Sequence, residues 1–437
     1  MSHNKALSLR HNFTWTLLGT LVFSGTNWLT TIVLAKLGSP LILGKYALAI
    51  AVTQPIFALA QMQLRSIQAT DVKDEHRFHD YFILRLICSA IALAVVGFFS
   101  FPGNPVNTAL VIFFTGVGLA LDSMSDVMYG LMQRYHRLDF MGKSMAFKGI
   151  LNISLIGLCF YLSHNIVTAM IGSVTSSALI VAFYDIRAAR FVMDRFANVE
   201  RVTAGFFPGK GERVDWLSIR EVLMRALPLG ATLLLMAFCN NITRYFVNHY
   251  LGEKQLGIFS ALGSLVIIGR TLVMSMGTTL STRLAGSFKG GDLAQYRKEL
   301  FRFALYCGVI GISLPLIAGI AGPKLIALVF TRDYTHDFGA FILLLVTGGV
   351  SYLVACVGYG LTSAGLFKVQ VPWFGSMTLV TAALAWCLIP RYGMMGAAWA
   401  GLLSQTIQLV IGCAILYAAV PVEIKKHTGV KLPSTVA

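Results

Sequence analysis

Charged side chains stand inside long apolar runs of this sequence. Arg270 lies in the middle of VIIGRTLVMSMG, residues 266–277, where every neighbour is apolar, glycine, serine or threonine. Asp122 and Asp126 lie four residues apart in LALDSMSDVMYG, so they share one face of a helix. An arginine in such surroundings can bind an anionic group, and a carboxylate can carry a proton.

The composition identifies the medium that surrounds these charges. The chain has 437 residues, of which 56% are hydrophobic and 12% charged, and its mean hydropathy is +0.71. Soluble domains carry roughly 25% charged residues. A helix of about 20 apolar residues crosses a bilayer and satisfies its own backbone hydrogen bonds. We therefore predict an all-α integral membrane protein with twelve spans: 13–35, 43–64, 80–101, 106–131, 141–162, 165–186, 222–248, 256–282, 300–321, 338–364, 369–389 and 393–420.

The basic residues predict the orientation of these spans. If both termini are cytoplasmic, the cytoplasmic segments and their flanks hold 24 lysines and arginines, whereas the outer segments hold 6. The net charge of +16 is thus spread over many short loops that face anionic membrane lipids. Because the basic residues form no single patch, we expect no nucleic acid partner.

An internal repeat divides the chain into two halves of six spans. Asn27, Leu37-Gly38 and Gly44-x-Tyr46 recur in order as Asn241, Leu251-Gly252 and Gly257-x-Phe259, and Tyr129-Gly130-Leu131 recurs as Tyr359-Gly360-Leu361. Six spans per copy keep both halves in the same orientation, so two such bundles facing each other would leave a cleft at the membrane midplane. The predicted parts are an N-terminal six-helix bundle (1–186), a cytoplasmic linker (187–221), a C-terminal six-helix bundle (222–420) and a cytoplasmic tail (421–437).

Polar residues of the seventh and eighth spans are the first candidates for substrate binding. A central arginine costs at least roughly 2.5 to 3.5 kcal/mol on insertion, so Arg270 should face a partner or water. A stripe of hydroxyl groups runs beside it: Thr271, Ser275, Thr278 and Thr282. Asn240, Arg244 and Asn248 are spaced at i, i+4 and i+8, with Asn241 adjoining. The alternatives are interhelical hydrogen bonding and, for Arg244, snorkelling to the outer interface.

Further charges lie near the cytoplasmic ends of the first spans. Arg65 and Arg85 are candidates for lining the inward mouth, although both are also placed for an interfacial role. Asp122 and Asp126 are candidates for coupling transport to an ion gradient, because desolvation and mutual repulsion favour proton uptake. The alternative is a structural ion pair with Lys148 of the fifth span.

Several features of the chain resemble a known family. They are the two six-helix halves, the LG…GxY element after the first span, Pro55 in the second span, and the stretch YGLTSAGLFKVQVPWFGSM…LIPRYGMMGAAWAGLLSQ. Together they resemble the Wzx-type polysaccharide flippases of the multidrug/oligosaccharidyl-lipid/polysaccharide exporter superfamily.

This resemblance implies a MATE-like, V-shaped pair of bundles with a cationic central cavity. Such a protein moves an undecaprenyl-diphosphate-linked oligosaccharide, the repeat unit of O-antigen, capsule or exopolysaccharide, across the bacterial cytoplasmic membrane by alternating access. Its expected partners are this glycan, membrane lipids, and the polymerase and chain-length proteins of the same pathway. We expect no metal or other cofactor, and a proton or a sodium ion is the candidate coupling ion.

Two other classes of protein are alternatives. A MATE-type exporter of cations or drugs would need an acidic cavity, whereas the embedded charges here are mostly basic. A polytopic polymerase or glycosyltransferase would need a large outer loop with catalytic groups or a DxD metal motif. The longest outer connection, 322–337, is short, and the sequence contains no DxD.

Overall fold

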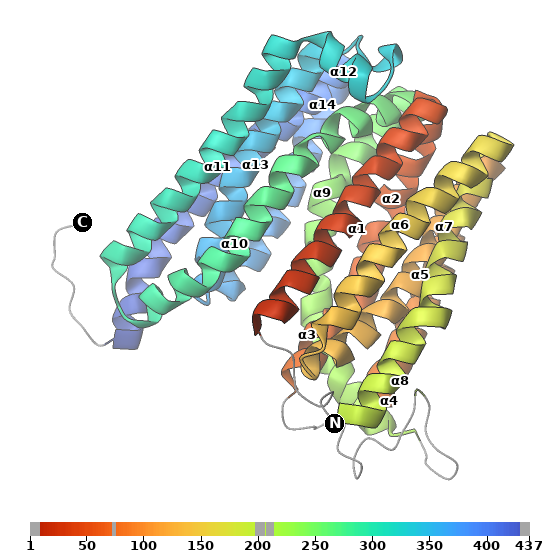
Figure 1. Ribbon diagram of the computed structural model, residues 1–437. Coiled ribbons are helices and arrows are strands. Elements are labelled where there is room, and N and C mark those ends of the chain that lie inside the picture. Colours follow the sequence, from red (N-terminus) through yellow and green to blue (C-terminus); the bar gives the residue numbers. More distant parts are fainter. Residues whose placement is uncertain (1–8, 72–75, 197–205, 207–213, 429–437) are drawn as a thin grey trace. The chain divides into compact units, whose positions relative to one another are not determined.

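The computed structural model describes residues 9–71, 76–196, 206 and 214–428, and nearly all of them are helical (Figure 1). Two compact units divide the chain, an N-terminal unit of Met1–Ala237 and a C-terminal unit of Phe238–Ala437. The division falls inside the long helix α9 (Trp216–Ser264), whose first part belongs to the N-terminal unit.

The N-terminal unit contains nine elements and the start of α9. They are α1 (Leu9–Leu37), α2 (Pro40–Gln61), α3 (Leu64–Thr70), α4 (Phe78–Ser100), α5 (Val106–Arg134), α6 (Leu138–Ser163), α7 (Ile166–Ile180), the π-helical turn η1 (Val181–Asp185) and α8 (Ile186–Phe196). The C-terminal unit continues α9 and adds α10 (Val266–Lys289), α11 (Leu293–Ala321), α12 (Pro323–Val329), the 3₁₀ turn η2 (Arg332–Tyr334), α13 (Phe338–Ser363) and α14 (Phe367–Thr428).

The predicted all-α membrane architecture is confirmed. Ten helices of the described chain are long and apolar enough to cross a membrane, so this is a multi-pass membrane protein. The 62-residue α14 holds two predicted spans, which are separated at Gly393. Gly252 likewise interrupts α9. Both glycines have positive φ angles, of 57° and 84°, which a residue with a side chain rarely adopts.

Several boundaries differ from the sequence prediction, including the start of α9 at Trp216, the end of α10 at Lys289 and the start of α11 at Leu293. The span predicted at 256–282 is interrupted near Leu265, where the Ser264 and Tyr352 hydroxyls donate to the carbonyls of Ala261 and Val266 at 2.7 and 2.6 Å. The helix predicted to end at 186 continues through η1 and α8, because the buried apolar stripe of Ala188, Ala189, Val192 and Met193 extends the core. In the predicted tail, α14 continues to Thr428.

Parts of the predicted linker and tails lie outside the described residues. For the linker these are 197–205 and 207–213, and for the two ends of the chain they are 1–8 and 429–437.

Small residues set the closest helix contacts in each unit. Helix α1 packs along α6, where a Cβ atom at Gly142 would lie 2.2 Å from the carbonyl oxygen of Trp15. In the C-terminal unit a Cβ atom at Gly269 of α10 would lie 2.4 Å from the Tyr352 hydroxyl of α13. A side chain at Gly142 would require the backbone of α1 to shift, and one at Gly269 would require the Tyr352 ring to move.

The repeated Leu-Gly pairs have the same structural role in both units. Leu37-Gly38 lies where α1 ends and α2 begins, and Leu251-Gly252 lies at the interruption of α9. Each pair therefore marks the turn between the first and second spans of its half.

Candidate functional site

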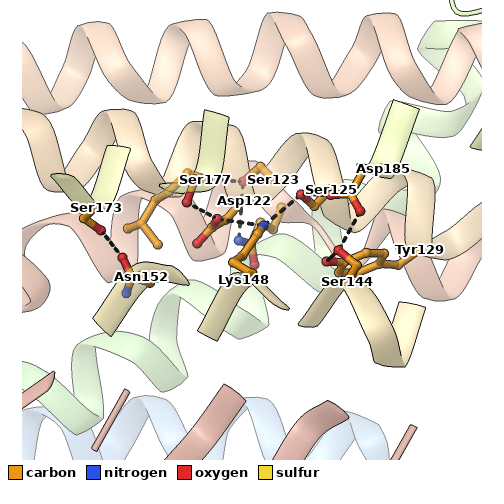
Figure 2. Close-up of polar contacts among 12 residues, drawn as sticks. Asp122, Ser123, Ser125, Tyr129, Ser144, Lys148, Asn152, Ser173, Ser177 and Asp185 are labelled. Carbon is orange, nitrogen blue, oxygen red and sulfur yellow. Dashed lines mark hydrogen bonds and ion pairs between the residues drawn. The ribbon is translucent and has the colours of Figure 1, made fainter. Parts of the chain in front are cut away.

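A polar network joins α5, α6, α7 and η1 inside the N-terminal unit (Figure 2). Its centre is the ammonium group of Lys148, which donates to Asp122 Oδ1 at 2.9 Å and to Ser125 Oγ at 2.8 Å. The hydroxyl of Ser177 donates to the same Asp122 oxygen at 2.9 Å. The ion pair between Lys148 and Asp122, anticipated as the alternative to a coupling role, is therefore present.

Asp185 is a member of this network that the sequence pattern did not predict. It accepts hydrogen bonds from Ser125 at 2.6 Å and from Ser144 at 2.5 Å, and Tyr129 in turn contacts the Ser144 hydroxyl at 2.6 Å. Its side chain is fully buried. Asp185 closes the π-helical turn η1, and such single-turn π segments are frequent at functional sites.

One sequence signal could have revealed Asp185. The apolar pattern does not stop at 186, because Ala189 and Val192 in the following turns are fully buried. Extending the sixth span through these residues would have moved Asp185 from the membrane surface into the protein interior.

Asp126 belongs to a second part of the network, formed with two arginines. Arg85 Nη2 donates to Asp126 Oδ2 at 3.0 Å, and Arg65 Nη1 lies 3.7 Å from Asp126 Oδ1. The guanidinium carbon of Arg65 also lies 6.0 Å from the centre of the Tyr129 ring, which connects the two parts. We call the ten side chains Arg65, Arg85, Asp122, Ser125, Asp126, Tyr129, Ser144, Lys148, Ser177 and Asp185 the charge network.

The Arg85 side chain does not extend to the protein surface, as snorkelling would require. Its side chain is fully buried because the guanidinium points toward α2 and α5, where it reaches the Ala60 carbonyl at 3.5 Å and the Asp126 carboxylate. Arg65 lies in α3, beyond the end of α2, and is partly exposed. Of the two residues predicted to line a mouth, only Arg65 is accessible in the described structure.

Arg270 has different surroundings in the C-terminal unit. It lies in the second turn of α10 and is exposed, and it takes part in no ion pair among the described side chains. The hydrogen bond from the Tyr352 hydroxyl to the Val266 carbonyl anchors the first turn of the same helix. The arginine therefore projects from a fixed backbone.

The remaining predicted binding residues lie on α9. Arg244 is half-buried and donates from Nη1 to Asn241 Oδ1 at 3.0 Å, and the Asn241 side chain is buried. Asn240 is exposed. A guanidinium can bind anions or hydroxyl groups, which is the chemistry of a phosphorylated or sugar ligand.

Solved structures with a similar fold are membrane transporters. The fold resembles the inward-facing conformation of a multidrug resistance MATE family transporter of the MOP superfamily, with a TM-score of 0.74, 14% sequence identity, and coverage of 93% of this chain and 96% of that one. The outward-facing conformation of such a transporter has a TM-score of 0.61 and 14% identity, with coverage of 94% of this chain and 95% of that one. A MOP superfamily transporter from Pyrococcus furiosus, reported to have a binding pocket of reverse polarity, has a TM-score of 0.59 and 15% identity, with coverage of 93% of this chain and 94% of that one.

Sequence comparison then gives the family. Residues 9–281 match the family described as polysaccharide biosynthesis protein, and the chain belongs to this family. A capsular polysaccharide biosynthesis protein, CapF of Staphylococcus aureus, is 24% identical over 403 residues, which cover 91% of this chain and 97% of that protein. The resemblance stated from the sequence is thus confirmed, and the fold is that of transporters of the MOP superfamily.

Proposed function

We propose that this transporter is a flippase for a prenyl-diphosphate-linked oligosaccharide. It moves the repeat unit of an O-antigen, capsule or exopolysaccharide across the bacterial cytoplasmic membrane by alternating access, with both termini in the cytoplasm. The polysaccharide biosynthesis family and the MOP fold support this proposal.

The observation that carries the proposal is the exposed Arg270. The sequence predicts Arg270 at the centre of a span, although α10 is not among the ten helices that are long and apolar enough on their own to cross a membrane. An arginine at that depth faces water or an anion, because its insertion costs at least roughly 2.5 to 3.5 kcal/mol. Among the described residues no carboxylate pairs with it, so its guanidinium donors are available to a ligand. A diphosphate presents the closely spaced anionic oxygens that a guanidinium binds in bidentate fashion.

Arg244, Asn240 and Asn241 extend this site in the proposal. The amide groups supply donors and acceptors for sugar hydroxyls, and Arg244 is oriented by Asn241. A lipid-linked glycan has an anionic headgroup and many hydroxyls, so both kinds of side chain have a counterpart on the substrate.

For energy coupling we propose the Asp122–Lys148 pair, with a proton or a sodium ion as the coupling ion. A proton or sodium ion that binds Asp122 would displace the Lys148 ammonium from this carboxylate. The ammonium would then keep its hydrogen bond to Ser125 of α5. The pair lies between helices α5 and α6, so a change in it can alter how these helices pack.

The embedded acids give no support to export of cationic drugs. Asp122, Asp126 and Asp185 each contact a cation or two hydroxyls within the N-terminal unit. Each acid already has an internal partner, so a cationic substrate would have to displace that partner to bind there.

Deletion of the gene in the bacterium that carries it tests the proposal. We expect the prenyl-diphosphate-linked repeat unit to accumulate on the cytoplasmic leaflet, measured by the access of a membrane-impermeant glycan probe to spheroplasts and to inverted vesicles. Repeat units that reach the outer leaflet but remain unpolymerised would contradict the flippase and favour a polymerase. Normal glycan export with a loss of drug resistance would favour the drug exporter.

A further inference from the structure

Asp126 contacts two arginines, and the two contacts differ in length. The bond from Arg85 Nη2 to Asp126 Oδ2, at 3.0 Å, has the length of a charge-assisted hydrogen bond. The approach of Arg65 Nη1 to Asp126 Oδ1, at 3.7 Å, is too long for one. With two guanidinium groups and one carboxylate, this group of three side chains carries one excess positive charge.

Burial separates the two arginines further. The Arg85 side chain is 0% exposed, whereas Arg65 and Asp126 are 31% and 27% exposed. Arg85 is therefore an internal counter-ion that holds the carboxylate. Of the two arginines, Arg65 is the one that a ligand can reach.

The contacts of Arg65 on its other sides are with neutral groups. Its Nε donates to Gln133 Oε1 at 3.2 Å, its Nη2 lies 3.1 Å from the Met141 sulfur, and its guanidinium faces the Tyr129 ring. A guanidinium has five N–H donors, so several remain for the oxygens of a second anion.

The local backbone places Arg65 at this position. Met62 and Gln63, between α2 and α3, adopt left-handed conformations with φ of 47° and 49°, which are uncommon for residues other than glycine. Gly130 of α5 then allows α3 to come so close that a Cβ atom there would lie 3.3 Å from Arg65 Cα. Strained backbone of this kind concentrates at functional sites.

We propose that Asp126 is an internal substitute for a phosphate group. In the absence of ligand it holds Arg65 through the long ion contact, and a phosphate group of the substrate displaces it from Arg65 while Arg85 retains it. The ligand class is a diphosphate ester, so this inference rests on the proposed function and adds a second anion site in the N-terminal unit.

Competition by Asp126 has a defined consequence for transport. The Asp126 carboxylate weakens phosphate binding at Arg65. It also pairs again with Arg65 when the phosphate dissociates, so that the phosphate is released and not held at the site. Removing the carboxylate should therefore tighten binding and slow transport, whereas a residue with a purely structural role would not change the two in opposite directions.

Binding of inorganic diphosphate to the purified full chain in lipid nanodiscs tests this, with calorimetry as the measurement. We expect Arg65→Gln to weaken binding by about tenfold or more, and Asp126→Asn to tighten it by about tenfold, since opposite or like charges within a few ångströms change affinity at least that much. Arg220→Gln is the matched control, because Arg220 is an exposed arginine of the same unit in the first turns of α9, and we expect it to bind like the wild type.

Asp126→Asn also leaves the buried Arg85 without its carboxylate, and this variant can fail to fold. The double variant Arg85→Met/Asp126→Asn removes both members of the buried pair and answers the same question, because Arg65 again loses its competitor. Unchanged affinity in either Asp126 variant, or in Arg65→Gln, would overturn the proposal.

Glycan export measured on the same variants separates this inference from the proposed function. If glycan export is lost in Arg270→Ala but diphosphate affinity is unchanged in the Arg65 and Asp126 variants, the role of Asp126 as an internal phosphate substitute is refuted and the proposed function is not. A protein that binds diphosphate as predicted but transports no lipid-linked glycan would refute the proposed function, and with it the role of Asp126 in transport.

Discussion

The two units differ in whether their embedded cations are paired with acidic side chains. In the N-terminal unit the charge network joins three cations, Arg65, Arg85 and Lys148, to the acids Asp122, Asp126 and Asp185. In the C-terminal half, residues 254–291 and 338–422 contain no acidic residue at all, although Arg270 lies in the first of these segments. The paired charges of the N-terminal unit stabilise that unit through internal contacts. Arg270, which has no acidic partner among the described residues, is suited to bind an anion from outside the protein.

A repeated motif shows how far the two units have diverged around one scaffold. The Tyr129 hydroxyl contacts Ser144 within the charge network, whereas the Tyr359 hydroxyl donates to the backbone carbonyl of Met274 at 3.4 Å. Gly277 is packed against the Tyr359 ring. The same Tyr-Gly pair thus supports a charged core in one unit and positions the arginine-bearing helix α10 in the other.

The comparison is tested most directly by removing the unpaired cation. Arg270→Ala should abolish glycan export while the protein still reaches the membrane at normal abundance, because no described carboxylate loses its counter-ion. Arg270→Lys should restore part of the export, since lysine keeps the charge but lacks the planar fork for bidentate binding. Export can be measured by surface glycan staining of a deletion strain, and abundance by immunoblot.

Arg283→Ala is the matched control for this experiment. Arg283 lies on the same helix, α10, and is also exposed, but it stands beyond the predicted end of the span at 282. We expect its loss to leave export near the wild-type level. Normal export by an abundant Arg270→Ala protein would remove Arg270 from the binding site.

Removing a paired cation should have the opposite signature. Lys148→Met leaves the Asp122 carboxylate without its ammonium partner, and because the Asp122 side chain is 33% exposed the cost lies below the roughly 3 to 5 kcal/mol of a fully buried broken pair. We expect low abundance and a lowered unfolding temperature in detergent. The double variant Lys148→Met/Asp122→Asn should recover much of the abundance, because the uncompensated charge is gone. A stable Lys148→Met protein would show that the pair contributes little to the fold.

Sequence patterns predicted the span architecture and part of the charge network. Hydropathy locates membrane spans because lipid requires long apolar helices, and the spacing of Asp122 and Asp126 already placed both on one helix face. The partners of Arg85 and Asp126 could not be predicted, since an arginine near a span end is equally compatible with snorkelling. The turn at Met62 and Gln63 was also unpredictable, because neither residue is the glycine that usually marks left-handed backbone.

The smallest effect is expected from changing Asp185, which accepts hydrogen bonds from two serine hydroxyls. Asp185→Asn keeps the size of the side chain, but its amide offers a single acceptor oxygen to two serine donors, so the hydroxyl proton of Ser125 or Ser144 loses its acceptor inside the protein. A buried group left without its partner typically costs roughly 1 to 3 kcal/mol. We therefore expect a modest fall in unfolding temperature, smaller than that of Lys148→Met.

Asp194→Asn is the control for this variant, because Asp194 is an exposed acid of the adjoining helix α8 and should tolerate the change. The decisive measurement is the double variant Asp185→Asn/Lys148→Met. If Ser125 links the two charges as the 2.6 and 2.8 Å bonds indicate, the two destabilisations will not add. Additive effects would mean that Asp185 and Lys148 act separately, and the contacts around Ser125 would then be two independent parts of the charge network.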